Sequence, residues 1–412
     1  MVRKMPKGVY ECIDCGHREV MESNDALLEK ACPKCGGDMV IVGFEITPVV
    51  EEEPAKDLIE KLSNFYSLGK TESRGDVTAF EVLEIRESNF EKVLKELESI
   101  GYWGALKKKE GKVVLYIFPA QEIKKENPFI GIGLFIATVL STLFAGYWLS
   151  SSYIVFLDEY NLPGIRNIYL NALAFSISVL AILGTHEMSH KIAATFHGVK
   201  STFPYFIPFP NILGTLGAVI RVKYPIPTRN AAIDLGSSGP IAGFIVAIPV
   251  LLIGLRLSPA LPTSAIAQVG GGIAFGESLI MIFLEKYIFK IPEDYVIYLH
   301  PVAIAGWVGI LVTFLNLVPA AQLDGGHIAR AFLGEKLHSI LTFGLGLAMI
   351  GLSVLWAGWL IEGFIILLMG RIGNPGALDE VSPISPKRIV LALVVLVIFI
   401  LSATPVPISV VQ

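Results

Sequence analysis

The sequence predicts an all-α polytopic membrane protein of about seven to eight membrane segments, with a small soluble part at its N-terminus. The 412 residues are 53% hydrophobic and only 17% charged, whereas soluble domains carry about 25% charged residues. The first 128 residues hold 19 of the 33 Lys and Arg and 24 of the 37 Asp and Glu, which leaves a long apolar remainder. Their acidic surplus argues against nucleic acid as a partner.

The first fifty residues carry two cysteine pairs, Cys12-x-x-Cys15 and Cys32-x-x-Cys35, each followed by glycine. This spacing is typical of a structural zinc ribbon, in which four thiolates close a tetrahedral site and leave no position for catalysis. Two disulfides are the alternative, which a reducing cytoplasm disfavours. We therefore predict a zinc ribbon over residues 1–50 that docks a substrate or partner, or stabilises the soluble part.

A second soluble module is predicted over residues 56–125, after a linker at 51–54. Apolar patterns of strand type cover 78–85 and 113–118, and apolar residues at helical spacing predict an amphipathic helix at 89–100. Together these elements indicate a small α+β module.

The membrane domain is predicted over residues 129–404, with a catalytic core at about 169–330. Lysines before its first apolar stretch mark a cytoplasmic helix end, and no secretory signal opens the chain. We expect a multi-pass protein of the cell membrane whose N-terminal domain is cytoplasmic. The predicted segments are 129–149, 169–196, 235–257, 270–289, 301–323, a hairpin over 338–370, and 389–403. The distribution of basic residues predicts a re-entrant or interfacial segment at 270–289.

A His-Glu-x-x-His pattern ends the second of these segments. At 3.6 residues per turn, His186 and His190 lie on one helix face with Glu187 beside them. Two imidazoles can hold one metal ion; a third ligand and a water would complete a catalytic zinc site, with the carboxylate as proton acceptor. A pair of hydrogen-bonded histidines is the alternative. The position of the motif inside a predicted membrane span favours the metal site. Insertion of an ionisable residue into a span costs about 2.5–3.5 kcal/mol unless a partner compensates its charge, and metal coordination supplies such a partner.

The third ligand is expected at the same depth on another helix. The candidates are Asp234, Glu277, Asp324, Glu362, His300 and His327. Asp324 is favoured, because it follows Pro319, which breaks the helical ladder and frees backbone groups for a functional cavity. Asp234 is equally well explained as an N-terminal helix cap. Glu277 and Glu362 are left without an assigned role.

The two motifs, His186-Glu187-x-x-His190 and Asn316-x-x-Pro319-x-x-x-Leu323-Asp324-Gly325, resemble the site-2 protease family of intramembrane zinc metalloproteases. Further matching segments lie at 198–200, 204–208, 214–218 and 239–243. They resemble the branch that includes chloroplast members needed for plastid development and their prokaryotic relatives. The resemblance covers about residues 169–330. It implies that His186, His190 and Asp324 bind zinc, that Glu187 is the general base and that Asn316 lies at the substrate site.

The predicted function is hydrolysis of a peptide bond in or near a transmembrane segment of another membrane protein, that is, regulated intramembrane proteolysis. The cofactors expected are one catalytic and one structural Zn²⁺, and the expected partners are a transmembrane protein substrate and the lipid bilayer. The sequence predicts no particular oligomeric state. A non-catalytic membrane scaffold of the same fold is one alternative. A metal-ion transporter that uses Glu277 and Glu362 as relay sites is another.

Residues 203–222 are apolar but too rich in proline and glycine for a helix. We expect either an extended re-entrant loop, which could bind an unwound substrate as an added strand, or a linker resting on the membrane.

Overall fold

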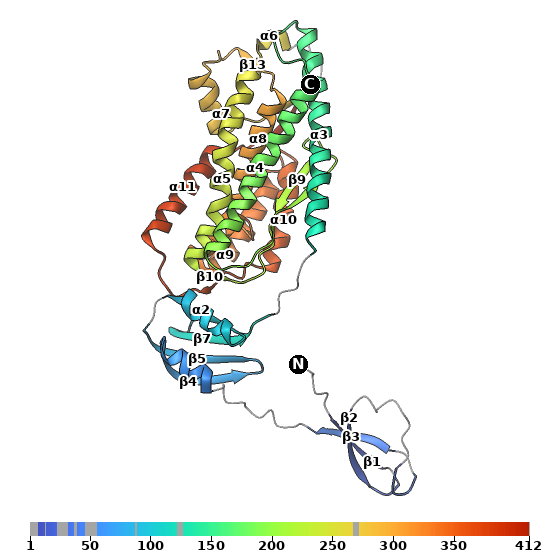
Figure 1. The fold of residues 1–412 in the computed structure, drawn as a ribbon, viewed down its shortest axis with the longest axis vertical. Helices are drawn as coiled ribbons and strands as arrows, with labels where there is room; N and C mark the ends of the chain where they lie inside the picture. Colours follow the sequence, from blue (N-terminus) through green and yellow to red (C-terminus); the bar gives the residue numbers. More distant parts are fainter. Residues whose placement is uncertain are drawn as a thin grey trace. The chain divides into compact units, whose positions relative to one another are not determined.

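The computed structural model describes residues 7–12, 14–22, 32–36, 39–45, 56–86, 89–121, 127–266 and 272–411. The chain divides into two compact units, Met1–Glu60 and Lys61–Gln412, which are described separately below (Figure 1). The predicted linker at 51–54 lies outside the described residues, and the predicted domain limits stay predictions.

The first unit contains a three-stranded antiparallel sheet in the order β2-β1-β3. Its strands are β1 (Lys7–Cys12), β2 (Arg18–Glu22) and β3 (Met39–Glu45). Gly16 and Gly36, with φ of 70° and 79°, close the two cysteine turns by donating their N–H groups to the carbonyls of Cys12 and Cys32. Glycine fits these left-handed positions because it has no Cβ.

The second unit begins with the α+β module. Its elements are α1 (Lys56–Ser63), which starts before the unit boundary, β4 (Tyr66–Arg74), β5 (Val77–Ile85), α2 (Phe90–Ser99), β6 (Tyr102–Lys109) and β7 (Lys112–Pro119). The predicted strands at 78–85 and 113–118 and the predicted helix at 89–100 are confirmed as β5, β7 and α2. Asn89 caps α2 by accepting from the Lys92 N–H, and the helix buries its apolar stripe as its periodicity predicts.

The rest of the unit is mainly helical (Figure 1). Its long helices are α3 (Pro128–Glu159), α4 (Ile168–Phe196), α5 (Arg229–Leu257), α8 (Pro301–Asn316), α9 (Asp324–Leu352), α10 (Gly358–Ile372) and α11 (Pro386–Ser402). The main core lies where α4, α5 and α8 meet, around Phe175, Leu251 and Trp307. A Cβ on Gly306 would lie 2.6 Å from the Leu251 backbone, so α5 and α8 pack with their backbones in close approach.

Among the described residues, three helices are long and apolar enough to cross a membrane: α3, α4 and α5. The predicted count of about seven to eight spans is therefore wrong. The later apolar stretches break into shorter helices, such as the 16 residues of α8, which rise only about 24 Å against about 30 Å of hydrocarbon. The α9 helix is kinked at Gly334, where φ is 75°. The described part of 270–289 holds a strand, β12 (Gly272–Phe275), the short α7 (Leu279–Phe283) and one π-helical turn (Leu284–Ile288).

The predicted hairpin over 338–370 is confirmed by α9 and α10. These helices approach closely at two glycines, because a Cβ on Gly363 would lie 2.7 Å from the carbonyl oxygen of Gly346. Packing of this kind uses small residues at the contact.

The all-α prediction for the membrane part is wrong, because short strands connect its helices. They are β8 (Tyr205–Pro208), β9 (Thr215–Val219), β10 (Ile226–Thr228), β11 (Ala260–Pro262), β12, β13 (Tyr295–Ile297), β14 (Ala377–Asp379) and β15 (Ile408–Val411). A short α6 (Thr263–Ile266) follows β11. Two of these strands join the sheet of the α+β module, whose order is β10-β14-β6-β7-β5-β4. The β14 strand runs parallel to β6, with Asp379 opposite Leu106.

Candidate metal centre

The His-Glu-x-x-His pattern lies in α4, as predicted, and all three of its ionisable side chains are buried. The Nε2 atoms of His186 and His190 are 3.2 Å apart. Asp324 is the first residue of α9, and its Oδ2 lies 3.3 Å from each of these two nitrogens. Two imidazoles and one carboxylate therefore converge on one point.

The geometry of this group fits zinc. Zinc binds nitrogen and carboxylate oxygen at about 2.0–2.1 Å in a tetrahedral arrangement, which places neighbouring ligand atoms about 3.3 Å apart. The three atoms from His186, His190 and Asp324 have this separation. Three protein ligands also leave a fourth tetrahedral position for water or substrate, as catalytic zinc sites do.

A tight turn between α8 and α9 places Asp324 next to the two histidines. Pro319 lies in this turn, and Ala321 adopts a left-handed conformation with φ of 52°. Gly325 and Gly326 follow the aspartate, where a Cβ would overlap with the carbonyls of Leu317 and Ala320 respectively. The Asp-Gly-Gly sequence is thus needed because the first turn of α9 lies directly against the preceding turn.

The α5 helix packs directly against the imidazole rings of the two histidines. A Cβ on Gly239 would overlap with the imidazole of His190, and one on Gly243 would lie 3.0 Å from Nδ1 of His186. His190 donates its Nδ1–H to the carbonyl of Leu235 over 2.8 Å. This hydrogen bond leaves the lone pair of Nε2 for a metal, the usual arrangement around histidine ligands.

Glu187 is held by residues 203–222, for which an extended loop is one of the two predicted alternatives. Residues 203–222 contain an antiparallel hairpin of β8 and β9, and the N–H of Ile220, just after β9, donates to Oε2 of Glu187 over 3.0 Å. The hairpin is attached to α3, because Ser141 donates its hydroxyl to the carbonyl of Gly214 over 2.6 Å. The extended conformation is confirmed, whereas substrate binding by this segment stays a prediction.

Asn316, the last residue of α8, also reaches the site. Its Nδ2 lies 3.4 Å from Nε2 of His186. The structure thus brings together all five residues of the predicted catalytic site: His186, Glu187, His190, Asn316 and Asp324. Their chemical roles stay predictions.

The other candidates for the third ligand are not members of the group formed by His186, His190 and Asp324. Asp234 binds His197 and Arg388, and the N-cap of α5 is Thr228, so the prediction of Asp234 as a helix cap is wrong. His300 caps α8 and approaches Asn171, 3.3 Å away. Three further candidates are spread over α9, the segment between β12 and α7, and α10: His327, Glu277 and Glu362.

Sequence reasoning missed one polar network beside the site. His197 caps the C-terminus of α4, and its two ring nitrogens contact Glu91 of α2 at 2.8 Å and Asp234 of α5 at 2.9 Å. Arg388 of α11 contacts the same Asp234 at 2.7 Å. Hydrogen bonds to Asp234 and then to Glu91 stabilise the imidazolium and raise the pKa of His197 to about 9. No sequence signal marks this network, because its members come from four distant segments.

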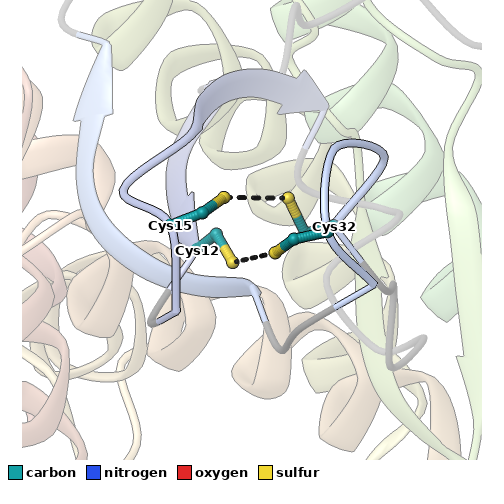
Figure 2. A group of neighbouring side chains, drawn as sticks. Cys12, Cys15 and Cys32 are labelled. Carbon is teal, nitrogen blue, oxygen red and sulfur yellow. Dashed lines mark hydrogen bonds between the residues drawn. The ribbon is translucent and has the colours of Figure 1, made fainter.

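The four cysteines of the first unit form a second possible metal site (Figure 2). The Sγ atoms of Cys12 and Cys35 are 3.4 Å apart, and those of Cys15 and Cys32 are 3.6 Å apart. All four thiols are free, which contradicts the disulfide alternative. Tetrahedral Zn–S bonds of about 2.3 Å separate sulfur atoms by about 3.8 Å, so the cluster is close to zinc geometry.

Comparisons with known proteins agree with the motifs. Residues 174–356 match the family model for Peptidase family M50. "Probable zinc metalloprotease EGY1, chloroplastic" from Arabidopsis thaliana is 32% identical over 241 residues, which cover 57% of this chain and 43% of that protein. "Probable zinc metalloprotease EGY2, chloroplastic" from the same plant is 31% identical over 229 residues, which cover 55% and 40%. The matched region thus spans less than half the length of these relatives.

One solved structure, "Site-2 Protease from Methanocaldococcus jannaschii", aligns with 55% of this chain and 87% of its own at 17% identity and a TM-score of 0.29, a likeness too weak to carry an argument. The family match is the informative comparison, because residues 174–356 include every member of the group formed by His186, His190 and Asp324. The predicted resemblance to peptidase family M50, the site-2 protease family, is therefore confirmed for this segment of the chain.

Proposed function

We propose that this chain is an intramembrane zinc metalloprotease that hydrolyses a peptide bond in or near a transmembrane segment of another membrane protein. One observation carries the proposal: Nε2 of His186, Nε2 of His190 and Oδ2 of Asp324 lie within 3.3 Å of one another. Glu187 is adjacent, and α4 is long and apolar enough to cross a bilayer. The family match and the names of the two plant relatives support the same activity.

When bound, zinc supplies a Lewis acid for the scissile carbonyl and lowers the pKa of a water molecule. The chain supplies the proton transfers, because the Glu187 carboxylate accepts the proton of the attacking water and returns it to the leaving amine. The N–H of Ile220 orients this carboxylate. The carbonyl of Leu235 fixes the ring of His190. Asn316 lies 3.4 Å from His186, and we assign it to the substrate site, as the family resemblance implies.

The substrate class follows from the chemistry of helices in lipid. A transmembrane helix hides its peptide bonds in its own hydrogen-bond ladder, so the substrate must unwind locally before attack. We expect substrates with Gly or Pro near the cleavage position. The hairpin of β8 and β9 offers an extended backbone next to Glu187 to which an unwound segment could pair.

The remaining predictions complete the proposal. The cofactors are one catalytic zinc and one structural zinc, the latter held by Cys12, Cys15, Cys32 and Cys35. The domains are a ribbon at 1–50, an α+β module at 56–125 and a membrane domain at 129–404. The protein lies in a cell membrane with its N-terminal domain in the cytoplasm, whereas the plant relatives are named as chloroplastic. Its partners are a transmembrane substrate and the bilayer.

The test is cleavage of a panel of single-span membrane proteins by the purified, detergent-solubilised chain. Glu187→Gln removes the general base and keeps the metal ligands, so it should bind zinc and cleave nothing. The expected result is products that require the native protein and disappear with a chelator. Zinc in both proteins without cleavage across the panel would contradict the proposal and favour the non-catalytic scaffold.

A matched variant separates the protease from the metal-ion transporter. Glu362→Gln neutralises an acid in α10, outside the group of His186, His190 and Asp324. The protease proposal expects this variant to cleave as the native protein does. Metal flux into vesicles that depends on Glu362, without proteolysis, would support the transporter instead.

A further inference from the structure

The turn that precedes Asp324 has an unfavourable backbone conformation. Ala321 has φ of 52°, in the left-handed region that residues with a Cβ adopt only when their surroundings impose it. Its side chain is buried. Because Asp324 follows only three residues later, any relaxation of Ala321 would move the carboxylate away from the two histidines.

Both peptide groups of Ala321 are held by side chains from other helices and loops. Its N–H donates to Oγ1 of Thr342 in α9 over 2.9 Å. Its carbonyl accepts from Nδ2 of Asn374, in the loop between α10 and β14, over 3.0 Å. A second hydrogen bond joins the same turn and loop, and here the turn is the donor. Nε2 of Gln322 donates to the carbonyl of Gly373 over 2.7 Å.

The amide of Asn374 is itself fixed at both ends. Its Oδ1 accepts from the N–H of Gly376 over 3.0 Å, and its Nδ2 also lies 3.4 Å from Nδ1 of His327. The loop around it contains Gly373 and Gly376 in left-handed conformations, with φ of 79° and 68°. Asn374 therefore presents its N–H₂ group to Ala321 in one orientation.

The carbonyl of Ala321 also touches the start of α9. A Cβ on Gly326 would lie 2.6 Å from this oxygen, and on the opposite side a Cβ on Gly236 of α5 would lie 2.6 Å from the carbonyl oxygen of Asp324. The aspartate is thus enclosed between the turn and α5. A rotated Ala321 peptide would press on the first turn of α9 and displace Asp324.

We propose that Asn374 is a positioning residue for the metal ligand Asp324 and acts through the Ala321 turn. This inference rests on the proposed function, because it assumes that Asp324 binds zinc. It goes beyond the family resemblance, since Asn374 lies outside the matched segment 174–356. The bond to Ala321 links two parts of the chain that are 53 positions apart.

The test measures metal binding by the full-length, detergent-solubilised protein. Asn374→Asp keeps the shape of the side chain but replaces the donor to Ala321 by an oxygen. Zinc affinity is measured by competition with a chelator, and cobalt is used as a spectroscopic substitute. The same measurements on His186→Ala give the contribution of the cysteine cluster, which is subtracted.

Asn374→Asp should weaken the His186-dependent metal affinity by about 10-fold or more, in the range typical of residues that orient metal ligands, and should alter the visible cobalt band. Asn230→Ala is the matched control, because this asparagine also holds a loop, through the N–H of Ser385, but leads to α11. The control should leave both readouts unchanged.

An affinity within twofold of the native value and an unchanged cobalt band in Asn374→Asp would overturn the inference. If that variant does not fold, Gln322→Ala removes only the second bond between the turn and the loop, the one to Gly373, and is judged by the same two criteria. Absence of any His186-dependent metal in the native protein would overturn the proposed function, and this inference with it. The two failures are therefore distinguishable.

Discussion

Gly239 of α5 lies so close to His190 of α4 that a single added methyl group would occupy the space of the imidazole. Gly239→Ala should therefore displace the histidine or push α5 away, and we expect loss of the catalytic zinc and of cleavage. Metal content per chain checks this outcome. Gly184→Ala is the control, because its Cβ would meet only Phe206, at an ordinary 3.7 Å. Normal zinc content in Gly239→Ala would contradict the close contact.

The two aspartates considered as ligands should behave differently. Asp324→Asn removes a proposed zinc ligand and should abolish metal binding at the His186 site. Asp234→Asn should keep the zinc but weaken the contacts with His197 and Arg388, at about 1–3 kcal/mol of folding free energy. Zinc analysis and thermal unfolding of both variants distinguish these effects. Loss of zinc in Asp234→Asn with retention in Asp324→Asn would reverse the assignment.

Stability should depend on pH through His197. Its pKa is about 9 in the folded protein and about 6.5 in an unfolded chain, so folding favours the protonated form. The stabilisation is complete below pH 6.5 and disappears as the pH rises through 9. The groups facing the ring are Glu91 of α2 and Asp234 of α5, with Arg388 of α11 on the same Asp234.

The experiment is thermal unfolding of the native protein and His197→Gln at several pH values. After allowance for solvent screening, we expect a difference of about 1–2 kcal/mol at pH 6.5 that shrinks towards zero above pH 9. A difference that stays constant across this range would contradict the charge-based explanation and leave only packing.

The cysteine cluster should be structural. Cys12→Ser removes one of four thiolates, so we expect loss of one zinc per chain and unfolding of the first unit. Zinc at the His186 site should remain, because the cluster and that site lie in different units. Metal analysis and limited proteolysis check both points. Loss of both zinc ions in Cys12→Ser would show that the two sites depend on each other.

Local patterns predicted most of the site. The spacing of His186 and His190 is a property of one helix, and Pro319 signals the break that brings Asp324 to the metal position. The strands β5 and β7 and the hairpin of α9 and α10 also follow from short-range periodicity and glycine placement.

The rest depends on long-range contacts. Hydropathy does not reveal where an apolar stretch stops being helical. The α8 helix ends at Asn316, before the turn that contains Ala321, and its 16 residues are too few for a span. Strands of three residues such as β10 and β14 have no periodicity of their own and are defined only by their partners. His197 likewise gains its role from Glu91 and Asp234, which its own sequence neighbourhood does not indicate.

The six-stranded sheet also constrains the order in which the second unit assembles during synthesis. The β6 strand is made early, whereas its parallel neighbour β14 follows α10, near the end of the chain. The edge of β6 that pairs with β14 therefore lacks its strand partner until almost the whole helical region has been translated. Until then its backbone N–H and C=O groups have no hydrogen bonds to β14. Pairing of β14 with β6 is therefore a late step of folding. Because β14 lies in the segment between α10 and α11, this pairing requires that segment to reach its native position.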